Sequence, residues 1–584
     1  MRRLLVLTMA VFVLCPSGVV TVAAPSASSA IVDGRASFAA LAAAYIADSQ
    51  RLEPVAADYA GVTTYSDALP DRTASGHERE IAAIRAWRAR FAAAPAVPDD
   101  ANTAADRRTV LDAIDQTLIE SETVAGWRHD PASYVGDLGA AFFLVATRTG
   151  ESADRRFSHI ARRLTQVPRF VDAAIANLVD ASKPSDALAS RQLGGTIAFV
   201  AGLEREDRTV SPVVRARISA ALPTALAALH HLRAFLDGPL RAKATRDPRI
   251  GRAAYDRLFR VTIGTDATPE ELAARARERI AATRAAMLTV AEPVFAAQFP
   301  DRVVTATGDA RIQAVVGAVL DERAKHHPTP GGFIGAARAA VAETEGFLRA
   351  TRAIALPQPE TLRVRRTPAY EAGVTGASAE TAGPYAPPNA PSYYNVDPPS
   401  GDAAATESQL REDNDDVMRI LTIHEAVPGH YVQLRYANRN PSIVRRILGN
   451  GSFIEGWAVW TEGFMLDQGF RDGDAGLRLA QLKWRLREAT NALLDIEYHA
   501  GTLSHDEAIR MLVHGAFQEK AEAEGKWHRL QLSYVQLSSY FAGLDAIERA
   551  ENASPLDQRA FAKRLLDMGS VEPRSIPALL AAGG

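Results

Sequence analysis

Apolar residues recur at three- and four-residue spacing through most of the first 350 residues of this chain, a pattern typical of amphipathic helices. The clearest predicted helices cover residues 37–50, 110–122, 269–290 and 336–353, which are rich in Ala, Leu, Arg and Glu. Lys183 to Ser190 reads as a short polar break that is too weak to be a linker. The pattern therefore predicts a mainly α fold with a large helical body and a deep cleft.

The composition changes between about residues 354 and 406, where prolines, glycines and serines crowd in. Two short runs in this segment, Leu362 to Arg366 and Ser392 to Val396, are typical of β-strands. Helical periodicity resumes at about Glu407 and continues to the end. We therefore predict an N-terminal helical half over residues 31–356. A second half over residues 357–584 begins with a β/loop-rich segment near 357–406 and carries the candidate chemistry.

The N-terminus has the features of a secretory signal peptide over residues 1–30. Two arginines precede an apolar run from Leu4 to Val20, and small residues follow through Ala30. The run is short for a membrane span, and a proline and a glycine interrupt it. Cleavage after Ala24 and cleavage near Ala30 both fit. We expect export to a periplasm or beyond, with no stable membrane insertion once the signal is removed.

Cys15 is the single cysteine of the chain, and it lies inside the predicted signal. A lipoprotein signal has a small residue directly before its cysteine, whereas Leu14 stands here, so we predict no lipid anchor. The mature chain would then have no disulfide and could offer a metal only His and carboxylate ligands. The formal net charge of −3 argues against nucleic acid as a partner.

The most informative segment is His424-Glu-Ala-Val-Pro-Gly-His430. Two histidines with a glutamate beside the first supply a zinc peptidase with two ligands and a general base, but the usual spacing is four residues. Residues six apart lie about 240° apart around a straight helix and cannot reach one ion. Pro428 and Gly429 can interrupt the helix. The sequence therefore predicts a bulge or break between Glu425 and His430; the alternative is two unrelated histidines near a helix end.

A third ligand is available from the next predicted helix. Glu455 follows His430 by 25 residues, and Glu462 lies on the same helical face seven residues later. The neighbouring Trp457 and Trp460 indicate that this helix is packed, and a buried carboxylate needs a partner. The alternative is a solvated acidic face. Glu462 either holds a ligand in place or binds a substrate amine.

These motifs resemble those of the bacterial domain-of-unknown-function family 885, whose hallmark is HEAxPGH followed by EGWA. That family is similar to the helical gluzincin peptidases. Other matching segments are Pro54 to Asp67, Asp495 to His499 with Glu497 in place of a glycine, and Gln536 to Gly543, so the resemblance spans the mature chain. It implies Zn²⁺ bound by His424, His430 and Glu455, with Glu425 as the general base.

The same resemblance implies that Tyr540 and His499 donate hydrogen bonds to the oxyanion formed during hydrolysis. The alternatives are a packed tyrosine with a satisfied hydroxyl and a structural histidine. Asp495, one helical turn earlier, could orient His499. Arg487 is either a clamp for a substrate carboxylate or an ordinary arginine.

We therefore expect an exported zinc-dependent metallopeptidase that hydrolyses short peptides. One alternative is a zinc hydrolase of non-peptide amides or esters, and another is a catalytically inactive helical protein that binds peptides. The intact Glu425 argues against the inactive protein, because binding alone needs no base. The sequence contains no Gly-x-Ser-x-Gly elbow, phosphate-binding loop or dinucleotide fingerprint. It leaves open the substrate, exo- or endo-action and the oligomeric state.

Overall fold

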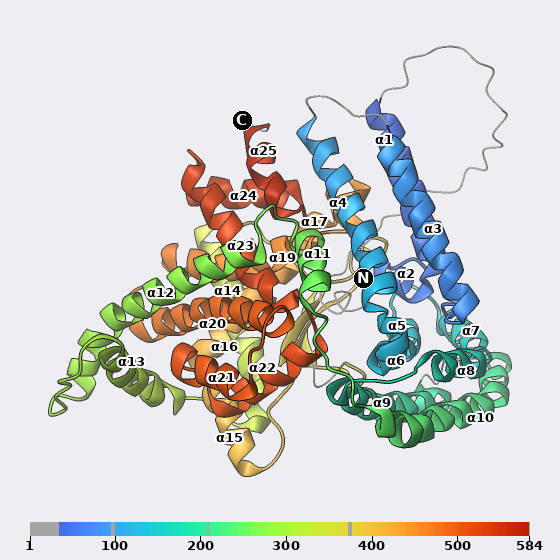
Figure 1. The fold of residues 1–584 in the computed structure, drawn as a ribbon, viewed down its shortest axis with the longest axis horizontal. Coiled ribbons are helices and arrows are strands. Elements are labelled where there is room, and N and C mark those ends of the chain that lie inside the picture. The colour runs from blue at the N-terminus through green and yellow to red at the C-terminus, as the bar shows by residue number, and fades with distance from the viewer. Residues whose placement is uncertain (1–33, 95–99, 207–208, 372–375, 583–584) are drawn as a thin grey trace.

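Helices build nearly all of the described chain. The computed structural model describes residues 34–94, 100–206, 209–371 and 376–582, so the predicted signal peptide and Cys15 lie outside the described residues. Within these ranges the helices are accompanied by three short strands (Figure 1). The predicted mainly α fold is confirmed.

The four helices predicted in the first half are present as α1, α4, α12 and α14. The helices of this part are α1 (Gly34–Leu52), α2 (Pro54–Ala60), α3 (Ala74–Ala93), α4 (Ala101–Ile119), α5 (Gly126–His129), α6 (Pro131–Thr147), α7 (Ala153–Leu164), α8 (Val167–Asn177), α9 (Lys183–Glu206), α10 (Pro212–Phe235), α11 (Arg252–Ile263), α12 (Pro269–Gln298), α13 (Gly308–Ala324) and α14 (Phe333–Thr351). Short π- and 3₁₀-helical turns are η1 (Glu120–Val124), η2 (Leu236–Leu240), η3 (Arg241–Lys243) and η4 (Pro330–Gly332).

The predicted polar break at Lys183 to Ser190 is wrong, because Lys183 begins α9. The polar side chains of this segment bind neighbouring elements and do not form a solvent-exposed loop. Ser190 donates to Asp237 over 3.0 Å, and Asp186 accepts from Arg241 over 3.0 Å. Polar residues at the start of a helix therefore gave the appearance of a break.

The second half begins with a small sheet and continues as helices. Its elements are β1 (Leu362–Arg366), β2 (Ala377–Glu380), β3 (Ser392–Val396), α15 (Ala403–Glu412), α16 (Asp415–Glu425), α17 (His430–Ala437), α18 (Ile443–Ile447), α19 (Gly451–Asp467), α20 (Ala475–His499), α21 (His505–Arg510), η5 (Met511–Gly515), α22 (Lys520–Leu532), α23 (Gln536–Ala553), α24 (Gln558–Met568), η6 (Pro573–Ser575) and α25 (Ile576–Ala581). The two predicted strands occupy the residues expected, whereas β2 was not predicted.

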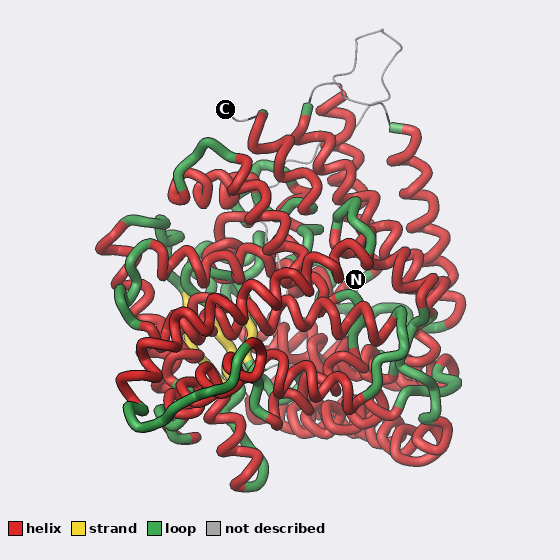
Figure 2. The backbone as a smooth tube through the Cα atoms, turned by 60° about the vertical axis from the view of Figure 1, so that its left-hand side comes forward, coloured by secondary structure: helices red, strands yellow, loops and turns green. Residues whose placement is uncertain are grey.

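The sheet has the order β1-β3-β2, with β3 parallel to β1 and antiparallel to β2. Figure 2 shows these strands as a small patch among the helices. Tyr394 and Val396 of β3 are fully buried in the same apolar cluster as Val417 and Ile423 of α16. The sheet therefore supports the helix that carries His424 and Glu425.

The apolar cores cross the predicted boundary near residue 356. One core is formed mainly by α2 and α6–α10, on the right of Figure 1, and it includes Tyr370 from beyond that boundary. Leu348 of α14, however, belongs to the core of the second half with Trp457, and Met287 of α12 packs in one cluster with Leu486 of α20. The two predicted halves remain a prediction, but the helices from α12 onward pack with the candidate site.

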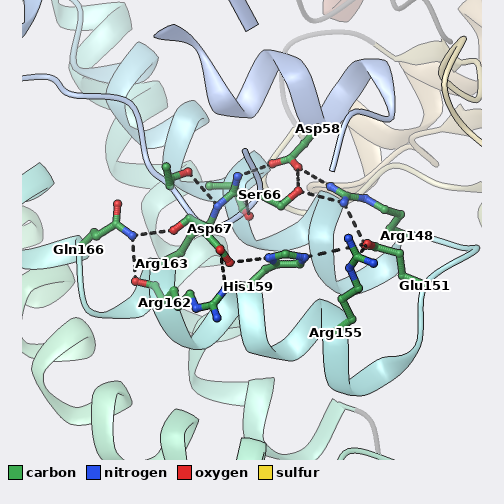
Figure 3. Close-up of polar contacts among 12 residues, drawn as sticks. Asp58, Ser66, Asp67, Arg148, Glu151, Arg155, His159, Arg162, Arg163 and Gln166 are labelled. Carbon is green, nitrogen blue, oxygen red and sulfur yellow. Dashed lines mark hydrogen bonds and ion pairs between the residues drawn. The ribbon is translucent and has the colours of Figure 1, made fainter. Parts of the chain in front are cut away.

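A buried polar network anchors α2 to α6 and α7 (Figure 3). Asp58 of α2 has no exposed side-chain surface; its carboxylate pairs with Arg163 over 2.5 Å and also accepts from Arg148 and Ser66. Arg163 additionally donates to Ala68 O over 3.0 Å. Because a charge buried this deeply must be paired, the network fixes the position of α2.

Candidate metal centre

The predicted helix break is present between α16 and α17. Helix α16 ends at Glu425 and α17 begins at His430. The Gly429 N–H donates to Ile423 O over 2.8 Å, and Trp457 Nε1 donates to Pro428 O over 3.0 Å. A Cβ atom on Gly429 would lie 1.8 Å from the carbonyl oxygen of His424, so only glycine fits here. The break turns His430 back toward His424.

The break brings both histidines to Glu455. Glu455 Oε2 lies 3.5 Å from His424 Nε2 and 3.3 Å from His430 Nε2. The two imidazole rings are nearly perpendicular, with centroids 4.8 Å apart. A tetrahedral zinc ion with bonds of about 2.0–2.1 Å separates its ligand atoms by about 3.3–3.4 Å. The distances from Glu455 to both histidines therefore fit one zinc ion.

The polar atoms of this cluster also lack other partners. Glu455 Oε2 and His430 Nε2 are buried and form no hydrogen bond within the described part of the chain. Burial raises the pKa of Glu455, but the two imidazoles outweigh it and lower that pKa to about 2. A buried anionic oxygen and a buried imidazole nitrogen without hydrogen bonds are costly, and a cation between them removes that cost.

Glu462 holds His424 from the other side. Its Oε1 lies 2.9 Å from His424 Nδ1, and its side chain is fully buried. Such a partner fixes the ring and leaves Nε2 directed at the metal position. Burial raises the pKa of Glu462 to about 7, although the contact with His424 acts in the opposite direction. The geometry favours the interpretation that Glu462 holds the proposed ligand His424 in place over the interpretation that it binds a substrate amine.

Glu425 lies beside the cluster as a second carboxylate. Ligand atoms of His424, Glu425 and His430 lie within 4.8 Å of one another, which makes Glu425 an alternative third ligand. Glu455 fits that place better, because its oxygen already lies at the tetrahedral spacing from both histidines. Glu425 Oε2 is buried and has no hydrogen-bond partner among the described residues. This leaves Glu425 available as a base.

Tyr540 packs directly on a proposed ligand. Its ring stacks on that of His424, with centroids 6.1 Å apart and an interplanar angle of 24°. Its hydroxyl oxygen accepts from Arg529 Nη2 over 2.7 Å and from Gln536 Nε2 over 3.2 Å. Burial raises the pKa of Tyr540, and Arg529 lowers it less. A hydroxyl that is protonated and accepts two hydrogen bonds is oriented to donate a third.

Two motif glycines allow the helices of Glu455 and Tyr540 to meet. A Cβ atom on Gly456 of α19 would lie 2.3 Å from the carbonyl carbon of Gly543 in α23. A Cβ atom on Gly543 would lie 1.8 Å from Ser452 O. The two backbones therefore touch at these glycines, which places Tyr540 beside the metal cluster.

The structure does not support the predicted role of His499 as an oxyanion donor. Its Nε2 atom lies 3.1 Å from Leu530 O and 2.8 Å from Ser533 O, so it donates to these carbonyls. The ring also stacks on Tyr255 at 5.9 Å. His499 instead holds the end of α22 against α20.

Asp495 and Arg487 also have structural partners. Asp495 accepts from Ser538 N over 3.1 Å and from Ser538 Oγ over 2.8 Å at the start of α23, and lies 3.8 Å from His499 Nε2. Burial raises the pKa of Asp495 to about 6, against the lowering effect of these hydrogen bonds. Arg487 pairs with Glu522 over 3.0 Å. Arg487, which was considered as a clamp for a substrate carboxylate, is therefore already paired with a carboxylate of the chain itself.

Two residues near the site were missed in the sequence. Arg529 binds the Tyr540 hydroxyl, and Trp484 packs its ring 5.8 Å from that of His424. Neither belongs to a motif with a chemical meaning, and only the packing of α20 and α22 reveals them.

Comparison with solved structures shows that the fold has precedents. A protein from Shewanella oneidensis, provisionally described as a lipoprotein of unknown function, is 27% identical, with a TM-score of 0.76 over 93% of this chain and 99% of that one. A protein from Colwellia psychrerythraea, provisionally described as a lipoprotein, is 15% identical, with a TM-score of 0.74 over 94% and 99% of the two chains, and shows the fold alone. No curated protein matches this chain.

The match to a known family covers nearly the whole chain. The model of the family described as "Bacterial protein of unknown function (DUF885)" matches residues 54–579, a range that includes every residue of the candidate metal centre. The chain belongs to this family.

Proposed function

We propose that this protein is an exported zinc-dependent metallopeptidase that hydrolyses short peptides. The observation that carries the proposal is the position of Glu455 Oε2, 3.5 Å and 3.3 Å from the Nε2 atoms of His424 and His430. Glu425 Oε2, which is buried beside these ligands and has no hydrogen-bond partner among the described residues, supports hydrolysis over metal storage.

His424, His430 and Glu455 would hold the ion, with Glu462 fixing His424. Zinc bound there would lower the pKa of water and polarise a carbonyl group. Glu425 accepts one proton from the attacking water as the new C–O bond forms, and delivers that proton to the amide nitrogen as the C–N bond breaks. Tyr540 donates its hydroxyl proton in a hydrogen bond to the oxyanion. The products are a carboxylate and an amine.

Export is supported by two independent features. The N-terminus has the charged, apolar and small-residue regions of a secretory signal. Two proteins of similar structure are provisionally described as lipoproteins, a class of exported proteins. The sequence before Cys15 differs from a lipoprotein signal, so the proposal is export without a lipid anchor.

The proposal is tested by elemental analysis and peptide hydrolysis with the purified mature chain. We expect about one zinc ion per wild-type chain and hydrolysis of short peptides, with both lost in His430→Ala. His231→Ala, which changes an exposed histidine of α10, is the matched control and should retain both. A wild-type protein that binds no zinc and cleaves nothing would refute the proposal. Cleavage of only esters or non-peptide amides in a substrate panel would correct the substrate class.

A further inference from the structure

A large cavity lies between the N-terminal helices and the elements that hold Tyr540. Its volume is about 320 Å³, and it is lined by residues of α1, α2, α3, α6 and α9 on one side and of α22 and α23 on the other. Val55, Ala56 and Tyr59 of the anchored helix α2 form part of this lining. A cavity of this size falls within the range of small-ligand sites.

The charges around this cavity are unequal. Six carboxylates contribute to the lining: Glu53, Glu80, Glu120, Asp130, Asp137 and Glu371. Among the described residues that line it, Arg529 is the one arginine, and lysine is absent. Glu53 and Asp137 are paired with Arg72 over 2.6 Å and 2.7 Å, so their charge is compensated. Arg529 is the arginine in the described lining that can attract a bound carboxylate group.

Arg529 also differs from the neighbouring cations in its partners. Its guanidinium donates to Gln536 Oε1 and Tyr540 Oη, both neutral, over 2.7 Å each, and no carboxylate oxygen of a described residue lies within ion-pair distance of it. By contrast, Arg487 and Lys526 both pair with Glu522, at 3.0 Å and 3.6 Å. A partly buried guanidinium that has no described carboxylate within ion-pair distance is costly to the folded protein, which is typical of a group that receives an anion.

The distance from Arg529 to the metal centre fits the end of a peptide. The Arg529 guanidinium carbon lies 5.7 Å from the Tyr540 ring centre, which lies 6.1 Å from the His424 ring centre, so guanidinium and ligand are within about 12 Å. An extended chain advances about 3.3–3.6 Å per residue. This upper limit corresponds to about three residues, so a carboxylate held by Arg529 lies at most about three residues from a peptide bond at the metal centre.

We infer that Arg529 binds the C-terminal carboxylate of the substrate, which makes the protein a carboxy-exopeptidase that releases at most about three residues. The cleavage part of this inference rests on the proposed function. The binding of a carboxylate by Arg529 does not depend on it. A free amine beside Arg529 is disfavoured by like charge, which argues against aminopeptidase action. An amidated C-terminus would lose the charge-assisted hydrogen bond.

The test compares tetra-alanine with its C-terminal amide, which differ only in the charge of the C-terminus. Binding is measured by calorimetry with Glu425→Gln, which prevents turnover, and with Glu425→Gln carrying Arg529→Met, Arg529→Lys or Tyr540→Phe. We expect the free acid to bind about 10- to 100-fold more tightly than the amide. This ratio should fall to about one with Arg529→Met, be partly kept with Arg529→Lys, and be unchanged with Tyr540→Phe, because that variant keeps the guanidinium.

Equal binding of the two peptides, binding of neither, or an undiminished ratio in a folded Arg529→Met protein would overturn the inference. Loss of the ratio in Tyr540→Phe as well would also overturn it, because Arg529 would then act only by positioning Tyr540. A preserved binding preference in a wild-type protein that cleaves no peptide would refute the proposed peptidase activity but not the carboxylate site.

Discussion

Replacing Gly429 by alanine tests whether the helix break holds the metal centre together. The new Cβ atom would lie 1.8 Å from His424 O and 2.4 Å from Ile423 O. Because Cβ atoms essentially never approach closer than 3.0 Å, the backbones of His424 and residue 429 must separate by at least 1.2 Å. Metal–ligand distances tolerate only about 0.2 Å. His424 and His430 therefore cannot both keep their positions at Glu455.

We expect Gly429→Ala to weaken zinc binding by at least about 100-fold. Loss of a residue that only supports a ligand costs about 10- to 100-fold, and this substitution displaces a ligand itself. The overpacking should also lower the free energy of unfolding by about 1–3 kcal/mol. Zinc affinity is measured by competition with a chromophoric chelator, and stability by denaturant unfolding of the metal-free protein.

Gly346→Ala is the matched control, because it also replaces a glycine by alanine and so adds one methyl group, here within helix α14. The Cβ atom at that position meets no atom within 4 Å, so zinc binding should be unchanged and stability should rise by about 0.5–1 kcal/mol. Wild-type zinc affinity in Gly429→Ala would refute the argument that the break sets the position of His430.

The remaining predictions concern the base, the supporting carboxylate, the oxyanion donor and the anchor of α2. Glu425→Gln should keep zinc but lose about 10²- to 10⁴-fold in kcat, and a normal rate would exclude Glu425 as the base. Glu462→Gln should weaken zinc binding by about 10- to 100-fold, measured by chelator competition; unchanged affinity would mean that Glu462 does not orient His424. Tyr540→Phe should lower kcat by about 10²- to 10³-fold with unchanged zinc content, and an equal loss of zinc would contradict its role as donor. Arg163→Met leaves Asp58 buried with Arg148 as its remaining cation, so unfolding should become easier by about 3 kcal/mol, and a change below about 1 kcal/mol would count against the network.

Local patterns in the sequence were sufficient for several elements that pack around the site. The helix of residues 269–290 and the strands at Leu362–Arg366 and Ser392–Val396 follow from periodicity and β-propensity, which act over a few residues. The helix break was also predictable, because six-residue spacing on a straight helix forbids a common ion. The polar start of α9 misled the same reasoning, because its partners come from distant segments.

Contacts between distant helices could not be predicted from the sequence. His499 matched a motif, but its orientation depends on the carbonyls of Leu530 and Ser533, more than 30 residues away. Arg529 attracted no attention because arginines are common, and only its lack of a carboxylate partner among the described residues distinguishes it from Arg487. The role of a charged side chain depends on its partners, and those partners are set by tertiary packing.

Anomalous diffraction from crystals of the zinc-loaded protein, recorded on both sides of the zinc absorption edge, tests the central claim most directly. We predict one strong peak about 2.0–2.2 Å from His424 Nε2, His430 Nε2 and Glu455 Oε2. A zinc-loaded protein whose anomalous peak lies elsewhere, or whose peak contacts only one of these three residues, would contradict the proposed metal centre.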